Sequence, residues 1–293
     1  MMSYLFKVFR RFIDSLKFIF VLGFALGLWT NINAQLSGTY TIGSGGNYTT
    51  INAAVTDLNT QGVNSAVTFN ILSGTYDEQF EIGIINGVSA SNTITFQSQT
   101  GNAADVIIQF IQVSGSNYIV RLNGTDYITF QNLTFTSLGS TTYCRMILID
   151  DNSDNISILN NVFNSVATTS TSNPAAHIWC DPSTTTSDNL LVESNDFNNG
   201  GPGILFSGVN TGNLASGTQI LNNTFSGVRR GIYMVYHDAP VIEGNVIDAT
   251  GDYGIRTDYC DNALVITKNQ VSAGSGYGIY LNYCDGGFPP TGT

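Results

Sequence analysis

The second half of the chain contains an internal repeat, and no other feature of the sequence constrains the fold as strongly. The first element of the repeat is an aliphatic residue, two further positions, an asparagine, one variable position and an apolar residue. An earlier copy over 130–135 has Leu133 in place of the asparagine. The asparagines of the other copies are 34, 28, 22 and 24 residues apart: Asn161, Asn195, Asn223, Asn245 and Asn269. Recurrence at such spacing is typical of a solenoid.

A second element recurs between these copies and consists of a glycine, alternating residues and a final aspartate. It occupies 231–238, 254–261 and 278–285, at separations of 23 and 24 residues. Each repeat therefore has two short strand-like segments joined by Gly and Asn turns, without room for a helix of about ten residues. We predict an all-β repeat with two strands per turn.

The composition agrees with this prediction. Gly, Asn and Thr, which favour turns and strands, supply 94 of the 293 residues, whereas strong helix formers are scarce. Only 10 Lys and Arg stand against 21 Asp and Glu, which gives a net charge of -11. This balance argues against nucleic acid as a partner, because a nucleic-acid backbone requires a basic surface.

Short β repeats bury their apolar side when they stack as coils. The predicted fold is therefore a parallel β-helix, in which equivalent residues of neighbouring coils lie about 4.8 Å apart. The five asparagines then form an internal ladder, where each amide bonds the backbone and the next asparagine at a bend. A leucine-rich repeat is the alternative, because its consensus also contains an asparagine, but the ladder of leucines is absent here.

Residues 1–34 differ from the rest of the chain, because four basic residues precede an apolar run of 12 residues over 18–29. This order is typical of a secretory signal peptide, and the run is shorter than the roughly 20 residues of a membrane span. We predict cleavage after Ala34; an uncleaved membrane anchor is the alternative. Cleavage removes four basic residues and one acid, so the net charge changes from -11 to -14.

The predicted β-helix domain covers 35–293 and begins with one short helix. Thr49 or Thr50 precedes apolar residues at helical spacing, and Gly62 ends the pattern. The end of a solenoid must be covered, so we expect this helix to cap the first coil. The repeat ends at Asp285 without such an element, and we expect the domain to be truncated at the C-terminus.

Several short stretches resemble a known family. Residues 45–51, Ala54 in the following helix, and 74–76 with Glu78 resemble the opening of right-handed parallel β-helix proteins of the pectin-lyase-like superfamily, especially pectinesterase-type chains. The asparagine repeats resemble the general repeat of that superfamily. The resemblance covers most of 40–285 and implies a right-handed coil. The start of the predicted mature chain at Gln35 and its high content of Thr, Asn and Gly also resemble surface proteins of the type IX secretion route. Their C-terminal sorting domain is not seen in this sequence.

The sequence departs from the enzymes of this superfamily. It lacks the paired Asp and partner Gln of the pectinesterase strands. It also lacks the Asn-Thr-Asp, Asp-Asp and Gly-His-Gly set of polygalacturonases, because its only Asp pair, 150–151, has no Gly-His-Gly after it. The resemblance therefore implies the fold, while the chemistry must come from the site itself.

Alternation along the second element predicts an outward column of side chains. With Tyr236 on the core side, this column contains Tyr233, Arg256 and Tyr280, with Asp258 in the next column. Rings stack on pyranose faces and Arg binds uronate carboxylates, so these four residues form a predicted polysaccharide-binding strip. The alternative is ordinary strand decoration, because Tyr favours strands.

Asp238, Asp261 and Asp285 fall at one turn position of three successive coils. Such a column of carboxylates is a ligand set for calcium, which takes six to eight oxygen ligands. The alternative is that each Asp caps its own turn. No other cofactor is expected.

A catalytic alternative uses the same region. A lyase needs a base near a calcium-bound uronate, and the candidate cluster is Arg256 with Asp258 and Asp238. His237 is a further candidate, because imidazole titrates near neutral pH; a solvated turn histidine is its alternative. We therefore expect a monomeric, secreted or surface-exposed protein that binds polysaccharide or mediates adhesion without catalysis. The second hypothesis is a polysaccharide lyase or glycoside hydrolase acting on uronate glycans.

Cys260 and Cys284 occupy one position of adjacent coils, so their α-carbons are expected about 4.8 Å apart, within the disulfide range. A disulfide and a stacked pair of thiols both fit this spacing. Cys144 and Cys180 show no matching register.

Overall fold

The computed structural model describes residues 2, 10, 34–150, 152–182 and 184–284. The chain divides into two units, Met1–Ala34 and Gln35–Thr293. The predicted signal peptide lies almost entirely outside the described residues. Within the described part of the chain, no helix has the length and apolar character that crossing a bilayer requires.

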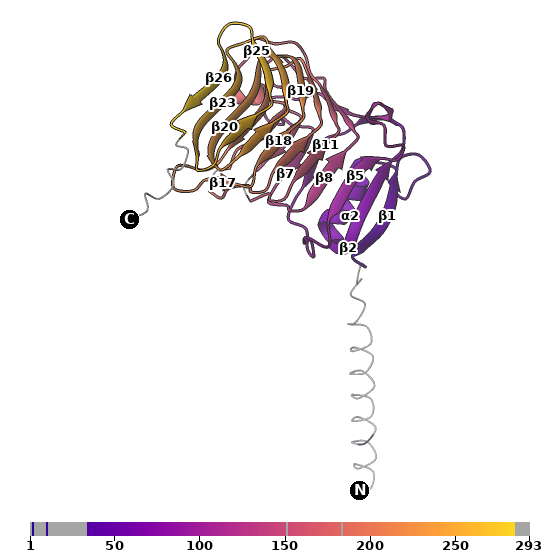
Figure 1. The fold of residues 1–293 in the computed structure, drawn as a ribbon. Helices are drawn as coiled ribbons and strands as arrows, with labels where there is room; N and C mark the ends of the chain where they lie inside the picture. The colour runs from indigo at the N-terminus through magenta and orange to yellow at the C-terminus, as the bar shows by residue number, and fades with distance from the viewer. Residues whose placement is uncertain (1, 3–9, 11–33, 151, 183, 285–293) are drawn as a thin grey trace. The chain divides into compact units, whose positions relative to one another are not determined.

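The described residues of the second unit form three parallel sheets that wind around one core (Figure 1). Sheet A contains β1 (Leu36–Ile42), β2 (Val63–Ile71), β5 (Ile94–Ser98), β8 (Ile128–Gln131), β11 (Ser157–Leu159), β14 (Leu191–Glu193), β18 (Gln219–Leu221), β21 (Val241–Glu243) and β24 (Val265–Thr267). Sheet B contains β3 (Gly74–Asp77), β6 (Val106–Phe110), β9 (Thr134–Ser137), β12 (Val162–Asn164), β15 (Asp196–Asn198), β19 (Thr224–Val228), β22 (Val246–Ala249) and β25 (Gln270–Ala273).

Sheet C contains β4 (Phe80–Ile82), β7 (Val120–Leu122), β10 (Ile147–Ile149), β13 (Ile178–Cys180), β16 (Pro202–Ser207), β20 (Arg230–Asp238), β23 (Tyr253–Asp261) and β26 (Tyr277–Asn282). The short β17 (Ala215–Ser216) also pairs with β20. Two 3-10 turns, η1 (Ala103–Asp105) and η2 (Asn173–Ala175), lie in the connections. Every strand pair is parallel, so the predicted stacking of coils is confirmed.

Each coil contains three strands, so the prediction of two strands per turn is wrong. The first sequence element bends in its middle: Ile158 lies in β11 of sheet A, whereas Phe163 lies in β12 of sheet B. The residue before the ladder asparagine adopts a left-handed conformation, with φ of 54° at Asn160 and 55° at Asn222. Asn tolerates this conformation better than most residues, which explains a sharp bend inside a continuous strand-like pattern.

The repeated asparagines form a continuous ladder at this bend, and all of them except the last, Asn269, are buried. The backbone N–H and the side-chain amide of Asn161 both donate to Asn195 Oδ1, at 2.9 and 3.1 Å. The same two bonds join Asn195 to Asn223, Asn223 to Asn245, and Asn245 to Asn269. Each amide also donates to a backbone carbonyl of a preceding strand, as from Asn223 to Val192 O at 2.9 Å. A buried polar column of this kind is stable because its groups are satisfied.

Apolar side chains stack along the axis beneath the three sheets. Phe163, Phe197 and Phe225 stack face to face, with ring centroids 4.8 and 4.6 Å apart. Phe69 and Phe96 form a second stack at 4.7 Å. Since all five rings are at most 1% exposed, stacking of the coils keeps this apolar surface away from water.

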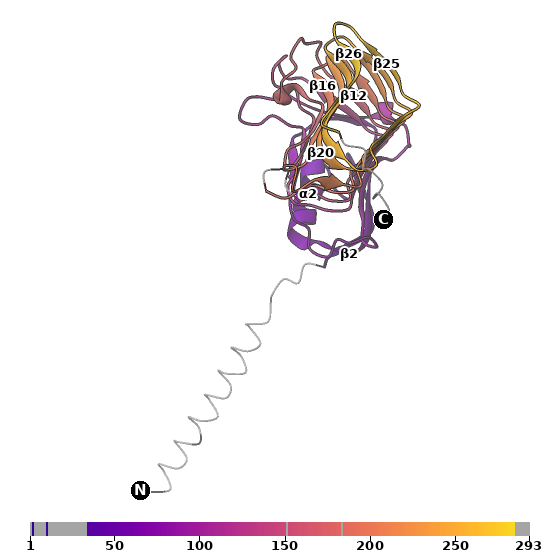
Figure 2. The same cartoon turned by 60° about the vertical axis from the view of Figure 1, so that its left-hand side comes forward.

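The predicted N-terminal helix is present as α2 (Ile51–Gln61). Thr50 is its N-cap and accepts from Ala53 N at 3.1 Å, and Gly62 ends it with φ 69°. Glu78 accepts from the first two helical N–H groups, of Ile51 at 3.0 Å and Asn52 at 2.8 Å. A carboxylate at a helix N-terminus stabilises it, so Glu78 fixes the start of α2 to the first coil. Figure 2 shows α2 beside the N-terminal coils, away from β25 and β26.

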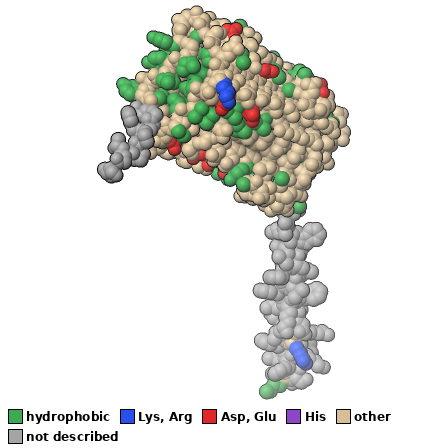
Figure 3. All heavy atoms as spheres, in the orientation of Figure 1, with side chains coloured by type: hydrophobic (Ala, Val, Ile, Leu, Met, Phe, Trp, Pro, Cys, Tyr) green, Lys and Arg blue, Asp and Glu red, His purple; other side chains and the backbone are tan. Residues whose placement is uncertain are grey.

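The inward residues of β26 differ from their equivalents in the preceding coils. Ile279 and Leu281 are 46% and 54% exposed, whereas Ile255 in β23 is fully buried. Among the described residues, β26 pairs with β23 alone. Hydrophobic side chains consequently gather on the surface at this end of the stack (Figure 3).

Candidate functional site

The outer face of sheet C holds the predicted column in register. Tyr233 in β20 pairs with Arg256 in β23, and Arg256 pairs with Tyr280 in β26. Asp258 lies two residues along β23, in the column that starts at Val235. Because each strand alternates between core and surface here, these side chains lie on one side of the sheet.

Arg256 lies at the centre of a cluster of tyrosine rings. Its guanidinium carbon is 4.7 Å from the ring centroid of Tyr233, 5.1 Å from that of Tyr253 and 5.5 Å from that of Tyr280. These distances are typical of cation–π contacts. We call Tyr233, Tyr253, Arg256 and Tyr280 the aromatic–arginine strip. Tyr253 was not among the predicted residues, because it is the first residue of its strand and lies outside the alternating column.

Asp258 fixes two members of the strip, Arg256 and Tyr233, through hydrogen bonds to its carboxylate. Its carboxylate is only 5% exposed and accepts from Arg256 Nη2 at 2.6 Å and Nε at 3.2 Å. The hydroxyl of Tyr233 donates to the same carboxylate at 2.7 Å. Burial raises the pKa of Tyr233, and the hydrogen bond to Asp258 raises it further, so this ring stays neutral.

The pKa of Arg256 is also shifted by its surroundings. Burial alone would lower this pKa, but the hydrogen bonds and the charge of Asp258 outweigh it and raise the pKa above its ordinary value. Arg256 therefore remains a cation at any physiological pH, which is unfavourable for a general base.

A second arginine extends the strip towards the start of β23. Arg230 lies 5.4 Å from the ring centroid of Tyr253 and donates from Nε to Asp252 Oδ2 at 3.1 Å. Tyr277, which is 59% exposed, stacks on Tyr253 at 6.1 Å. Arg256 pairs with Asp258, and Arg230 pairs with Asp252, which also lies 4.0 Å from Arg229 Nε. This surface therefore has one more cation than anions and several oriented N–H groups. Arg230 and Tyr277 were missed at the sequence level because strand starts fall outside the alternating pattern.

Tyr236 does not face the core, which corrects the predicted alternation. Tyr236, Tyr259 and Tyr283 adopt left-handed conformations, with φ of 60°, 51° and 51°. Their rings stack outside the core at 5.2 and 4.8 Å. The bend shifts the inward position to the next residue. The recurrence of Tyr at the same place in three repeats was the sequence signal for this column.

His237 consequently lies in the core rather than in a solvated turn. It is fully buried, and burial lowers its pKa to about 4. It pairs in register with Cys260, which is also fully buried. The structure therefore does not bring His237 to the outer face, where Arg256 and Asp258 meet.

Two of the three aspartates of the predicted calcium column lie within the described residues. Asp238 and Asp261 pair in register, and the side-chain amide of Asn262 donates to Asp238 Oδ1. Asp285 lies outside the described residues. Among the residues that the structure describes, no three His, Cys, Asp or Glu side chains are grouped to hold a metal ion.

Cys260 and Cys284 are present as thiols, one of the two arrangements that their spacing allows. The thiol of Cys260 donates to Met234 O at 3.8 Å, and that of Cys284 donates to Thr257 O at 3.4 Å. Burial raises the pKa of Cys260 to about 12, which makes this thiol unreactive.

Residues 183–288 match a family model described as right handed beta helix region. The fold is a right-handed parallel β-helix. The match confirms the handedness that the pectin-lyase-like resemblance implies, and the three sheets extend the same fold to the N-terminal coils. No curated protein matches the sequence significantly.

Two solved structures are similar to this chain at low sequence identity. The deglycosylated pectin methylesterase of Aspergillus niger has 12% identity and a TM-score of 0.45, over 86% of this chain and 87% of that chain. A rhamnogalacturonan lyase has 11% identity and a TM-score of 0.37, over 87% of this chain and 64% of that chain.

Proposed function

We propose that this right-handed β-helix binds polysaccharide through the aromatic–arginine strip on the outer face of sheet C, without chemical change to the glycan. The observation that carries the proposal is the position of Arg256 over three tyrosine rings, fixed by the buried carboxylate of Asp258. We also propose that the protein is exported, which rests on the signal-peptide pattern of 1–34.

The strip presents two kinds of contact to a sugar chain. Tyrosine rings offer apolar faces to the C–H groups of a pyranose ring. Arg256 binds Asp258 through Nε and Nη2, so Nη1 stays available for a hydroxyl or a uronate carboxylate. Because the strip is held by contacts within the protein, little side-chain entropy is lost on binding.

The geometry favours binding over catalysis. Arg256 is held as a cation by Asp258, whose own carboxylate is buried and already accepts three hydrogen bonds. His237, the other acid–base candidate, is fully buried on the core side. A lyase or hydrolase would require a proton-transfer group within reach of the bound sugar.

Affinity electrophoresis in gels that contain polygalacturonate tests the proposal. We expect the gel to retain the wild-type protein, and the Tyr253→Ala/Tyr280→Ala variant to bind about tenfold more weakly, since it loses two stacking faces. Tyr143→Ala is the matched control, because Tyr143 lies outside the strip, and it should migrate like the wild type. Equal retention of the strip variant would refute the proposal.

The catalytic hypothesis has its own test. Incubation with polygalacturonate and calcium should leave the absorbance of unsaturated uronate products and the number of reducing ends unchanged. An increase in either quantity that is lost in Arg256→Gln would establish catalysis at the strip instead of binding alone.

A further inference from the structure

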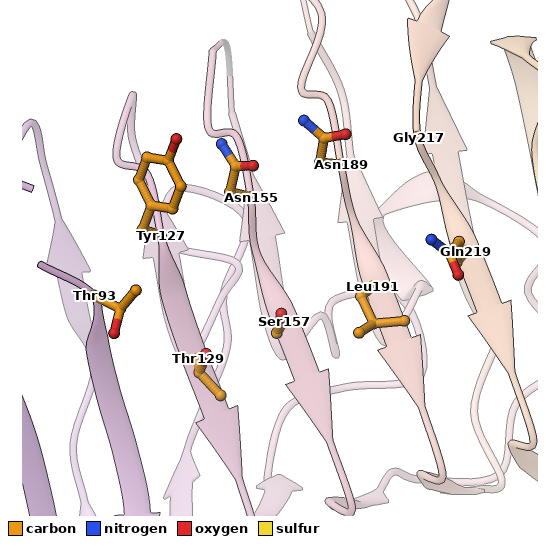
Figure 4. A pocket seen from close by; sticks show the side chains of 9 residues that line it. All are labelled: Thr93, Tyr127, Thr129, Asn155, Ser157, Asn189, Leu191, Gly217 and Gln219. Carbon is orange, nitrogen blue, oxygen red and sulfur yellow. The ribbon is translucent and has the colours of Figure 1, made fainter. Parts of the chain in front are cut away.

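A shallow groove crosses the outer face of sheet A, on a different sheet from the aromatic–arginine strip. Its volume is about 330 Å³, and residues from five consecutive coils line it (Figure 4). None of the lining residues is charged. The groove is therefore a second, chemically different surface on the same coil.

Two rows of side chains line the groove. Tyr127, Asn155 and Asn189 form one row just before the strands, with φ of 55°, 57° and 56°. The other row follows the strands, where Thr129 pairs in register with Ser157. Gln219 continues this second row two coils further on. Figure 4 shows the Tyr127 ring and the two Asn amides above the second row, in which Leu191 lies between Ser157 and Gln219.

The polar groups of the groove are available to a ligand. The side-chain amides of Asn155, Asn189 and Gln219 make no hydrogen bond to the rest of the described chain. Gly217 occupies the position after Asn189 in the first row, and a Cβ atom on it would lie 2.2 Å from Asn189 Oδ1. A glycine at this place therefore leaves the Asn189 amide undisturbed. The groove offers donors and acceptors of a hydroxyl-binding site at regular intervals.

We propose that the groove binds one chain of an uncharged polysaccharide, laid along the axis of the coil with about one pyranose ring per coil. Neighbouring coils lie about 4.8 Å apart, which is close to the advance of one ring in an extended β-linked chain. Amides and hydroxyls that repeat at this spacing match hydroxyls that repeat along the sugar. The Tyr127 ring provides a stacking face at one end.

The absence of charge in the lining selects against acidic glycans. A uronate carboxylate in the groove would lose part of its hydration without gaining a cationic partner. A neutral hydroxyl loses less and regains hydrogen bonds from the amides. The groove thus adds a site for a different glycan class to the site on sheet C, and it does not depend on that proposal.

Isothermal titration with cellohexaose tests the groove directly. Ser157→Arg places a long side chain in the middle of the second row, and we expect at least about tenfold weaker binding because the chain is blocked. Thr68→Arg is the matched control: Thr68 occupies the same outward column, two coils before Thr129 and outside the groove. It should bind cellohexaose like the wild type.

Two further measurements make the result decisive. Gln219→Ala removes one amide without adding bulk and should weaken cellohexaose binding about threefold, which keeps the proposal testable if Ser157→Arg fails to fold. The Tyr253→Ala/Tyr280→Ala variant should bind cellohexaose normally, so failure of either site is distinguishable from failure of the other. No binding by the wild type, or unchanged binding by both groove variants, would overturn the proposal.

Discussion

The strip on sheet C and the groove on sheet A present opposite chemistry on one scaffold. Both consist of outward residues in parallel strands at the same spacing. The strip combines tyrosine rings with two arginine–aspartate pairs, whereas the groove has amides, hydroxyls and no charged residue. Inward residues must match the next coil, but outward residues have no such constraint. A β-helix can therefore keep one core and vary its faces independently.

The core side chains under sheet A and sheet C also differ in whether they can carry charge. The side chains under sheet A are aliphatic or aromatic, as at Ile128, Phe130 and Ile220, which are all fully buried. On the side of sheet C the core includes two fully buried histidines, His177 and His237. Titratable groups thus lie on both sides of sheet C, and acid should affect this sheet first.

Acid is expected to produce the largest change. Burial lowers the pKa of His177 to about 3 and that of His237 to about 4, from 6.5 in an unfolded chain. Their contribution to stability is complete above pH 6.5 and is lost as the pH falls towards these values, because only the unfolded state takes up the protons. At pH 4.5 each histidine should reduce the free energy of unfolding by roughly 2–3 kcal/mol, measured by urea denaturation against pH 7.

The repeat itself provides the control for this prediction. His237→Cys places in β20 the residue that the next coil has at the equivalent position, Cys260. This variant should lose about half of the acid sensitivity. Hydrogen exchange at pH 4.5 should open the strands of sheet C before those of sheet A. Equal acid sensitivity of the variant, or simultaneous opening of both sheets, would contradict the contrast between them.

Removal of the charge beneath the strip is expected to have an intermediate effect. Asp258→Asn leaves the Arg256 guanidinium, which is 24% exposed, without its anionic partner. We expect a loss of about 2 kcal/mol in the free energy of unfolding, because a partly buried cation is left unpaired. Asp261→Asn removes the same charge from the same strand, at a site without an ion pair to any residue that the structure describes, and should change stability by less than about 0.5 kcal/mol. Equal effects of the two variants would show that Asp258 does not hold the strip.

The smallest effect is expected on sheet A. Gln97 donates to Asn70 Oδ1 at 2.8 Å and accepts from the Gln131 amide on the outer face. Water replaces these bonds at a half-buried site, so Gln97→Ala should cost less than about 1 kcal/mol by urea denaturation. If Gln97→Ala lowered the free energy of unfolding more than Asp258→Asn does, the neutral side chains on sheet A would stabilise the fold more than the ion pair on sheet C.

Patterns that repeat from coil to coil could be predicted from the sequence. The five ladder asparagines, the helix with Thr50 and Gly62 at its ends, and the column of Tyr233 with Arg256 all follow from local spacing. The third strand of each coil could not be found in this way. The bend at residues such as Asn160 interrupts no hydrophobic pattern, because the positions on both sides of it point into the same core.

The sequence by itself determined that the chain stacks coils, because a repeat of this length can bury its apolar residues only against its neighbours. It also determined which residues recur at equivalent positions of successive coils. Only the tertiary structure decided which way the residues after a bend face. The left-handed conformation of Tyr236 moves His237 into the core, and the packing of neighbouring coils brings Arg230 to the Tyr253 ring and opens a groove across five coils on sheet A. These features depend on contacts between coils, which no single repeat contains.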